Sequence, residues 1–142
     1  MKVIVNCGGR YKNDEKAENI LNHHVGYIDS LMSALKKKFK FRLPAELVLR
    51  PLYYRGIAMM AGRFNYNPSK GYSMALHIEE CKNRKNKGEV IVKHECAHFA
   101  NIMLHEDWGH GEKFRKMKSV CCMIGNKTKG RNRRNSKNLS SS

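Results

Sequence analysis

The chain contains an HExxH pattern, His94-Glu95-Cys96-Ala97-His98. The pattern lies in an apolar-rich segment for which we predict a helix from about Glu89 to Leu104. On a helix, residues four positions apart lie one above the other, so the imidazoles of His94 and His98 can reach one metal ion. Zinc binds neutral imidazole nitrogen at about 2.0–2.1 Å, and two such ligands leave room for a third ligand and a water molecule. The pattern therefore predicts a zinc site, with Glu95 placed to accept a proton from that water.

A third ligand can come from the segment that follows this helix. His110 lies between Gly109 and Gly111, immediately before a second helix that we predict from about Glu112 to Met123. Glycine adopts backbone conformations that other residues avoid, so the chain can turn sharply here and present His110 toward the preceding helix. His110 is therefore the first candidate for the third ligand.

Four other residues are weaker candidates for this ligand. His105 follows His98 by seven residues, which is one more than the HExxHxxGxxH pattern requires. Glu106 and Glu112 could supply carboxylates, but they fit better as a loop acid and as an acid at a helix N-terminus. His77 lies on a predicted strand and is better explained as a structural histidine.

The remaining sequence predicts one long helix and a small sheet. Apolar residues recur at steps of three and four from Leu21 to Phe39, which is one face of an amphipathic helix with Asn13 or Asp14 as its N-cap. Two apolar runs, 57–66 and 72–78, flank a turn that contains Pro and Gly, which is typical of a hairpin. The other predicted elements are a short strand or extended arm within 1–12, a strand at 46–49 and a polar loop at 79–88. Together they predict an α+β domain with an N-terminal helix, a small antiparallel or mixed sheet and two C-terminal helices.

Three stretches resemble, in the same order, the motifs of the SprT-like zinc metalloproteases. Residues 109–117 (GHGEKFRKM) resemble the HGxxFxxxM signature that follows HExxH in that family. Residues 39–44 (FKFRLP) resemble the FNxRLP motif at the start of its domain, and residues 61–66 (AGRFNY) resemble its AGxCxY strand. The resemblance covers roughly residues 30–120.

The resemblance implies a zincin-like fold and a zinc-dependent endopeptidase that acts on DNA-associated or DNA-crosslinked proteins. It implies that the zinc ligands are His94, His98 and His110, that the general base is Glu95, and that Phe114 and Met117 pack behind the site. Zincins hold an extended substrate along an edge strand beside the cleft, and we expect residues 72–78 to form that strand. Many members also carry a four-cysteine zinc ribbon, which the adjacent Cys121 and Cys122 cannot form.

The charge of the chain points to a polyanionic partner. The formal net charge is +16, and residues 113–142 contain ten basic side chains and no acidic one. We therefore predict a folded domain over 1–125, a basic disordered tail over 126–142, and binding of DNA or RNA through the basic surface and this tail. The alternative function is a non-enzymatic, basic nucleic-acid-binding protein with a structural metal site. In a further alternative, the HExxH pattern is accidental in a basic protein that associates with RNA or a membrane surface.

Cysteine content and hydropathy bear on the compartment. The five cysteines form no CxxC pair, which argues against a disulfide framework. No apolar stretch approaches the ~18–20 residues of a membrane span. The residues after Lys2 include only three consecutive apolar positions, too few for a signal-peptide core. We expect a monomeric cytoplasmic protein with no membrane partner.

Overall fold

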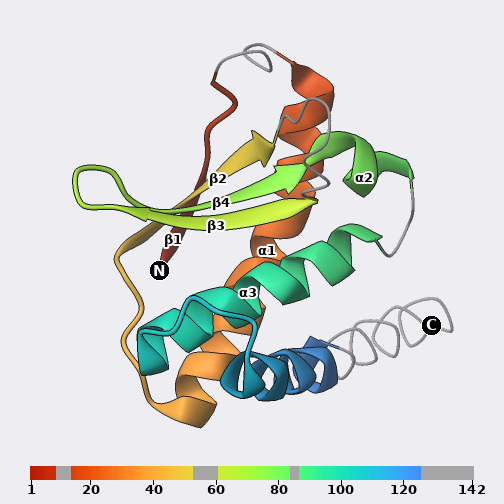
Figure 1. Cartoon of the computed structure of the whole chain (residues 1–142). Coiled ribbons are helices and arrows are strands. Elements are labelled where there is room, and N and C mark those ends of the chain that lie inside the picture. The colour runs from red at the N-terminus through yellow and green to blue at the C-terminus, as the bar shows by residue number, and fades with distance from the viewer. Residues whose placement is uncertain (9–13, 53–60, 84–86, 126–142) are drawn as a thin grey trace, which may run out of the picture.

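The computed structural model describes residues 1–8, 14–52, 61–83 and 87–125 (Figure 1). In chain order the labelled elements are β1 (Lys2–Val5), α1 (Glu15–Phe39), β2 (Glu46–Leu52), β3 (Gly62–Asn67), β4 (Gly71–His77), α2 (Ile78–Asn83) and α3 (Lys87–His105). Residues 112–125 are also helical, and we call them the C-terminal helix. The predicted α+β class is confirmed. The predicted tail at 126–142 and residues 57–60 of the first hairpin strand lie outside the described residues.

The four strands form one mixed sheet in the order β1-β2-β4-β3. β1, β2 and β4 are parallel, and β3 runs antiparallel to β4. The expectation that residues 72–78 form the edge strand is wrong, because β4 pairs with β2 on one side and with β3 on the other. The edge strands of the described sheet are β1 and β3, and β3 is the one that contacts α3. The burial of β3 and β4 explains this order, since β4 is the more buried of the pair while β3 is mostly exposed.

Helix α1 begins and ends where its sequence provides caps. The Asp14 carboxylate accepts hydrogen bonds from the backbone N–H groups of Lys16 (3.0 Å) and Ala17 (3.2 Å), which confirms Asp14 as the N-cap. Three lysines, at 36–38, occupy the last turn, where positive charge is favourable. Lys40 adopts the left-handed conformation and ends the helix.

The predicted polar loop at 79–88 is wrong in its first half, because α2 begins directly after β4. Ile78 is buried, and the two glutamates that follow it favour a helix N-terminus. His77 Nδ1 accepts a hydrogen bond from the backbone N–H of Glu80 (3.2 Å) and so caps the helix. His77 is therefore a structural histidine, as predicted.

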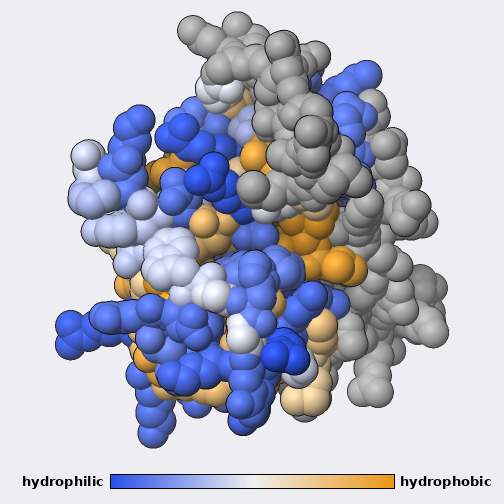
Figure 2. Space-filling model, viewed as in Figure 1, coloured by the Kyte–Doolittle hydropathy of each residue, from blue (hydrophilic) through white to orange (hydrophobic). Residues whose placement is uncertain are grey.

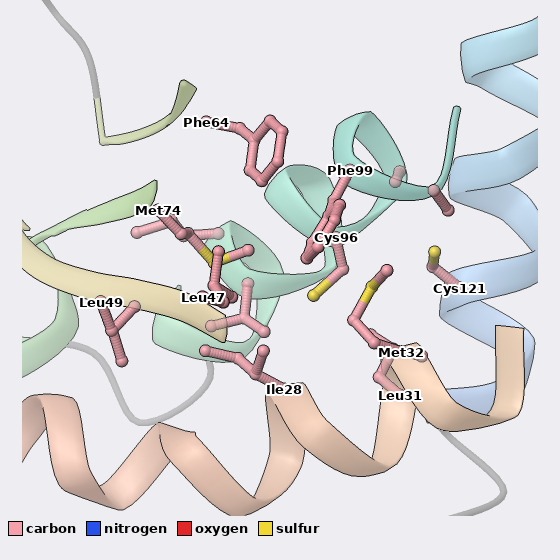
Figure 3. Packing of buried hydrophobic residues seen from close by; sticks show 14 of the residues in the cluster. Ile28, Leu31, Met32, Leu47, Leu49, Phe64, Met74, Cys96, Phe99 and Cys121 are labelled. Atoms are coloured by element: carbon pink, nitrogen blue, oxygen red, sulfur yellow. The ribbon is translucent and has the colours of Figure 1, made fainter. Parts of the chain in front are cut away.

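One hydrophobic core joins the sheet to the helices. Figure 3 shows Ile28 of α1 near Leu47 of β2, and Met32 of α1 near Cys96 of α3 and Cys121 of the C-terminal helix. Cys96 and Phe99 of α3 approach the same core from the other side, so Cys96 is a core residue, as its position in the HExxH helix requires. Each fully buried large apolar side chain contributes about 1.5–3 kcal/mol to folding. In the described part of the chain, no helix combines the length and apolarity that crossing a bilayer requires.

Candidate metal centre

The end of α3 sets the direction of the segment that carries His110. The helix ends at His105, and Glu106 adopts the left-handed conformation with φ 53°. The backbone N–H of Glu106 donates to the carbonyl of Ile102 (2.8 Å). We expected Gly109 or Gly111 to provide the sharp turn, but Gly71 is the only described glycine with positive φ. The chain therefore reverses at Glu106.

Two side chains hold the turn in place. The fully buried Asn101 donates a side-chain N–H to the carbonyl oxygen of Asp107 (3.2 Å). The Asp107 carboxylate then accepts a hydrogen bond from the backbone N–H of Gly109 (2.9 Å). These contacts link the inner face of α3 to the residues immediately before His110, and the C-terminal helix begins two residues after it.

The turn brings the three predicted histidines together. Potential ligand nitrogens of His94, His98 and His110 all lie within 4.8 Å of one another. The Nε2 atoms of His98 and His110 are 2.9 Å apart, close to the roughly 3.3 Å expected between two ligands of a tetrahedral zinc ion with about 2.05 Å bonds. One hydrogen bond can join only two of these nitrogens, whereas a single cation can bind all three at once. This cluster could hold a metal ion.

The surroundings keep two of these imidazoles in the neutral form that binds metals. Burial, followed by the charges of Lys118 and His110, lowers the pKa of His94. Burial, followed by His94 and His110, lowers the pKa of His98 to about 4. Because a metal ligand must be unprotonated, these shifts reduce the competition from protons.

Phe114 forms the back wall of the cluster. Its ring stacks on His98 with centroids 4.2 Å apart, and it contacts His94 (5.0 Å) and His110 (4.9 Å) at steep angles. Phe114 and Met117 are both buried. The packing role that the resemblance implied is confirmed for Phe114, and Met117 is a buried core residue.

Glu95 follows His94 on α3 and is buried. Its side chain is only 4% exposed, and burial raises its pKa to about 7. Gly62, the first residue of β3, makes room for this side chain. A Cβ atom at Gly62 would lie 2.6 Å from Ile91 Cγ2 and 3.0 Å from Glu95 Cγ. The edge strand and the carboxylate therefore approach closely because residue 62 has no side chain.

Replacing Gly62 with alanine should disturb Glu95 more than the histidine cluster. We expect Gly62→Ala to destabilise the protein by about 1–3 kcal/mol, since the new methyl group must displace packed neighbours. Any cleavage activity should fall by a larger factor than the metal affinity. Denaturant unfolding, metal titration and a cleavage assay measure the three effects. Gly26→Ala is the matched control, because a Cβ atom there would meet no atom within 4 Å beyond the neighbouring backbone of its own helix. An equal loss of stability in this variant would contradict the steric explanation.

Replacing Asn101 should loosen the turn that carries His110. Asn101→Ala removes the N–H group that holds the Asp107 carbonyl, so we expect metal affinity to fall about 10–100-fold, the usual cost of removing a residue that orients a ligand. Asn101→Asp keeps the shape of the side chain but loses this donor, and its affinity should fall as well. Competition with a chromophoric chelator measures the affinity. An unchanged affinity in folded Asn101→Ala protein would show that the turn holds His110 without Asn101.

The weaker ligand candidates lie elsewhere. Among the described residues, the one group of metal-binding side chains comprises the three histidines alone. His105 and Glu106 are exposed at the end of α3. Glu112 forms an exposed ion pair with Lys116 (3.2 Å) in the first turn of the C-terminal helix.

Trp108 lies near Phe64, on the face of β3 that packs against α3. It is 49% exposed, and its ring centroid is 6.0 Å from that of Phe64. It borders a surface hollow of about 540 Å³, whose other lining residues are Tyr66, Tyr72, Ile102, Met103 and Glu106. Trp108 is therefore both packed on β3 and open to solvent.

Comparison with protein-family models, curated proteins and solved structures found no match to this chain.

Proposed function

We propose that this protein is a zinc-dependent endopeptidase of the SprT-like, zincin type. The observation that carries the proposal is the convergence of His94, His98 and His110 beside the buried Glu95. Catalytic zinc sites use three protein ligands and leave one position open, whereas structural sites close with four. Within the described residues no fourth ligand accompanies the three histidines.

The residues of the centre fit the roles that peptide hydrolysis requires. Zinc bound by the three imidazoles would supply Lewis acidity for the scissile carbonyl and for the attacking water. Glu95 would take a proton from that water and pass it to the leaving amine nitrogen. The burial of Glu95 favours this role, because a carboxylate whose pKa is about 7 can both accept and return a proton near neutral pH.

The strand beside the centre offers a place for an extended substrate. In the described sheet, β3 pairs with β4 alone, so its outer backbone groups are open to another strand. Gly62 at its start adjoins Glu95, and the hollow at Trp108 lies toward its far end. We infer that a peptide adds to β3 and passes the metal centre. The net charge of +16 supports proteins on nucleic acid as the substrates.

A cleavage assay tests the proposed function. The purified full chain is loaded with zinc and incubated with casein, and separately with a DNA-bound protein, with and without a chelator. We expect cleavage that the chelator abolishes and that added zinc restores. Stoichiometric zinc binding without cleavage of either substrate would instead favour a non-enzymatic nucleic-acid-binding protein with a structural metal.

A further inference from the structure

The sheet has a second face, turned away from the helices. Side chains alternate along a strand, so Phe64 points toward the core and α3 while its neighbours Arg63 and Asn65 point to the opposite side. On β4, Met74 and Leu76 are buried toward the helices, and Ser73 and Ala75 lie on the opposite side. In Figure 1, α1 and α3 lie on one side of the sheet. Most of the described surface seen in Figure 2 is hydrophilic.

The strand register makes this face a trough. Arg50 of β2 and Arg63 of β3 both pair with Ala75 of β4, so two long cationic side chains flank a methyl group. In the neighbouring row, Val48 and Asn65 flank Ser73 in the same way. Short side chains on β4 therefore form the floor of the trough, and longer side chains on β2 and β3 form its walls. The trough has a volume of about 290 Å³.

The hairpin turn places a third cation at one end of the trough. The Asn67 side-chain oxygen accepts hydrogen bonds from the backbone N–H groups of Ser69 (2.8 Å) and Lys70 (3.3 Å), and these bonds order the turn. Lys70 lines the trough together with Asn67 and Gly71.

The lining has the chemistry of a phosphate-binding surface. It contains three cations, Arg50, Arg63 and Lys70, and three uncharged polar side chains, Asn65, Asn67 and Ser73. No acidic and no aromatic residue is among the described residues that line it. Glu46 lies further along β2, opposite Lys2 in the register. Arginine suits phosphate because its planar guanidinium donates two parallel hydrogen bonds.

We propose that this trough binds the sugar–phosphate backbone of a nucleic-acid duplex. Surfaces that bind single strands present aromatic rings on which the bases stack, and the described lining has none. A duplex presents its phosphates outward, and three cations at the sides of a narrow trough complement that charge. The trough and the histidine cluster lie on opposite sides of the sheet, so a bound duplex leaves the metal centre open. The inference does not depend on peptidase activity.

Substitution of Ala75 at the floor of the trough tests the proposal. Ala75→Glu places a carboxylate between the two arginines, where opposite charges on neighbouring strands are tolerated by the fold. Ala75→Gln is the matched control, since it has the same size without the charge. The full chain is titrated with a mixed-sequence 20-base-pair DNA duplex at several salt concentrations, in the presence of a chelator.

The slope of log K against log[salt] is negative, and each phosphate contact contributes about 0.9 to its magnitude. Ala75→Glu should therefore reduce the magnitude of the slope by about 1–2 units and raise the Kd about 10–100-fold at 0.1 M salt. Ala75→Gln should change the Kd by less than about threefold, an effect too small for the loss of even one phosphate contact. Both variants retain the basic tail, so the difference between them reports the trough alone. Equal affinities of the two variants would overturn the proposal.

Titration with single-stranded DNA of the same length tests whether the partner is a duplex. Single strands bound as tightly as the duplex, with the same loss in Ala75→Glu, would overturn the assignment to a duplex.

If Ala75→Glu does not fold, the double variant Arg50→Gln/Arg63→Gln replaces it, with Lys36→Gln/Lys37→Gln as a control at exposed positions of α1. A slope whose magnitude falls by about two units in the arginine variant and not in the lysine variant supports binding at the trough. An equal fall in both would show that net charge alone governs binding.

Discussion

The Glu95→Gln variant should lose about 10²–10⁴-fold in cleavage rate, which corresponds to roughly 3–5 kcal/mol of activation free energy, while keeping its fold and its metal. Glutamine has nearly the same size as glutamate and can still hydrogen-bond to a water molecule, but it cannot accept a proton from it. Glu95 is not one of the three residues of the metal-binding cluster, so metal affinity should change little. Initial rates on a protein substrate, together with metal content and thermal unfolding, measure these effects.

Glu112→Gln is the matched control for this experiment. The substitution is the same, but Glu112 is exposed and makes only a surface ion pair with Lys116, which contributes about 0–1 kcal/mol. Its cleavage rate should stay near that of the unmodified protein. Equal rates for Glu95→Gln and Glu112→Gln would show that Glu95 is not the base, whereas loss of metal from Glu95→Gln would show that the carboxylate supports the ligands instead.

The sequence predicts those elements that carry a long periodic pattern of apolar residues or a hydrogen-bonding preference between neighbouring residues. Helix α1 repeats its apolar positions over many turns, and its Asp14 cap is a local hydrogen-bonding preference. Helix α2 was not predicted, because its six residues are too few to show a periodic pattern of apolar residues. The place of β4 inside the sheet could not be predicted either, because strand order depends on which strand buries more surface against the helices.

The site shows the same division between local and long-range signals. His94 and His98 follow from helical spacing, and His110 was suggested by its position after α3. Asn101 and Gly62 were not predicted as parts of the centre, because their roles depend on contacts with other segments. A signal for Asn101 did exist. It lies three residues after His98, on the same side of the helix, and a polar residue at such a position needs a partner when it is buried.

The His110→Ala variant should lose the metal, with affinity reduced by more than about 100-fold, because removal of a ligand costs more than removal of a residue that merely orients one. Two histidines on one helix remain, and they leave a metal ion with two protein ligands in place of three. His110 is exposed, so its truncation opens no cavity in the core and the helices should persist. Metal content after dialysis, measured by atomic absorption, reports the loss, and circular dichroism reports the fold.

His105→Ala distinguishes this ligand set from the nearest alternative. His105 is also an exposed histidine close to the end of α3, but it is not part of the three-histidine cluster. We therefore expect His105→Ala to retain one metal ion per chain. Full retention in His110→Ala combined with loss in His105→Ala would mean that the segment after α3 adopts a different turn, in which Asn101 does not hold Asp107. Loss in both variants would mean that both histidines are needed to hold the metal, and the three-histidine cluster would then be incomplete as a ligand set. Retention in both would mean that either histidine can occupy the third position, and the hydrogen bonds around Asp107 would not decide which one binds.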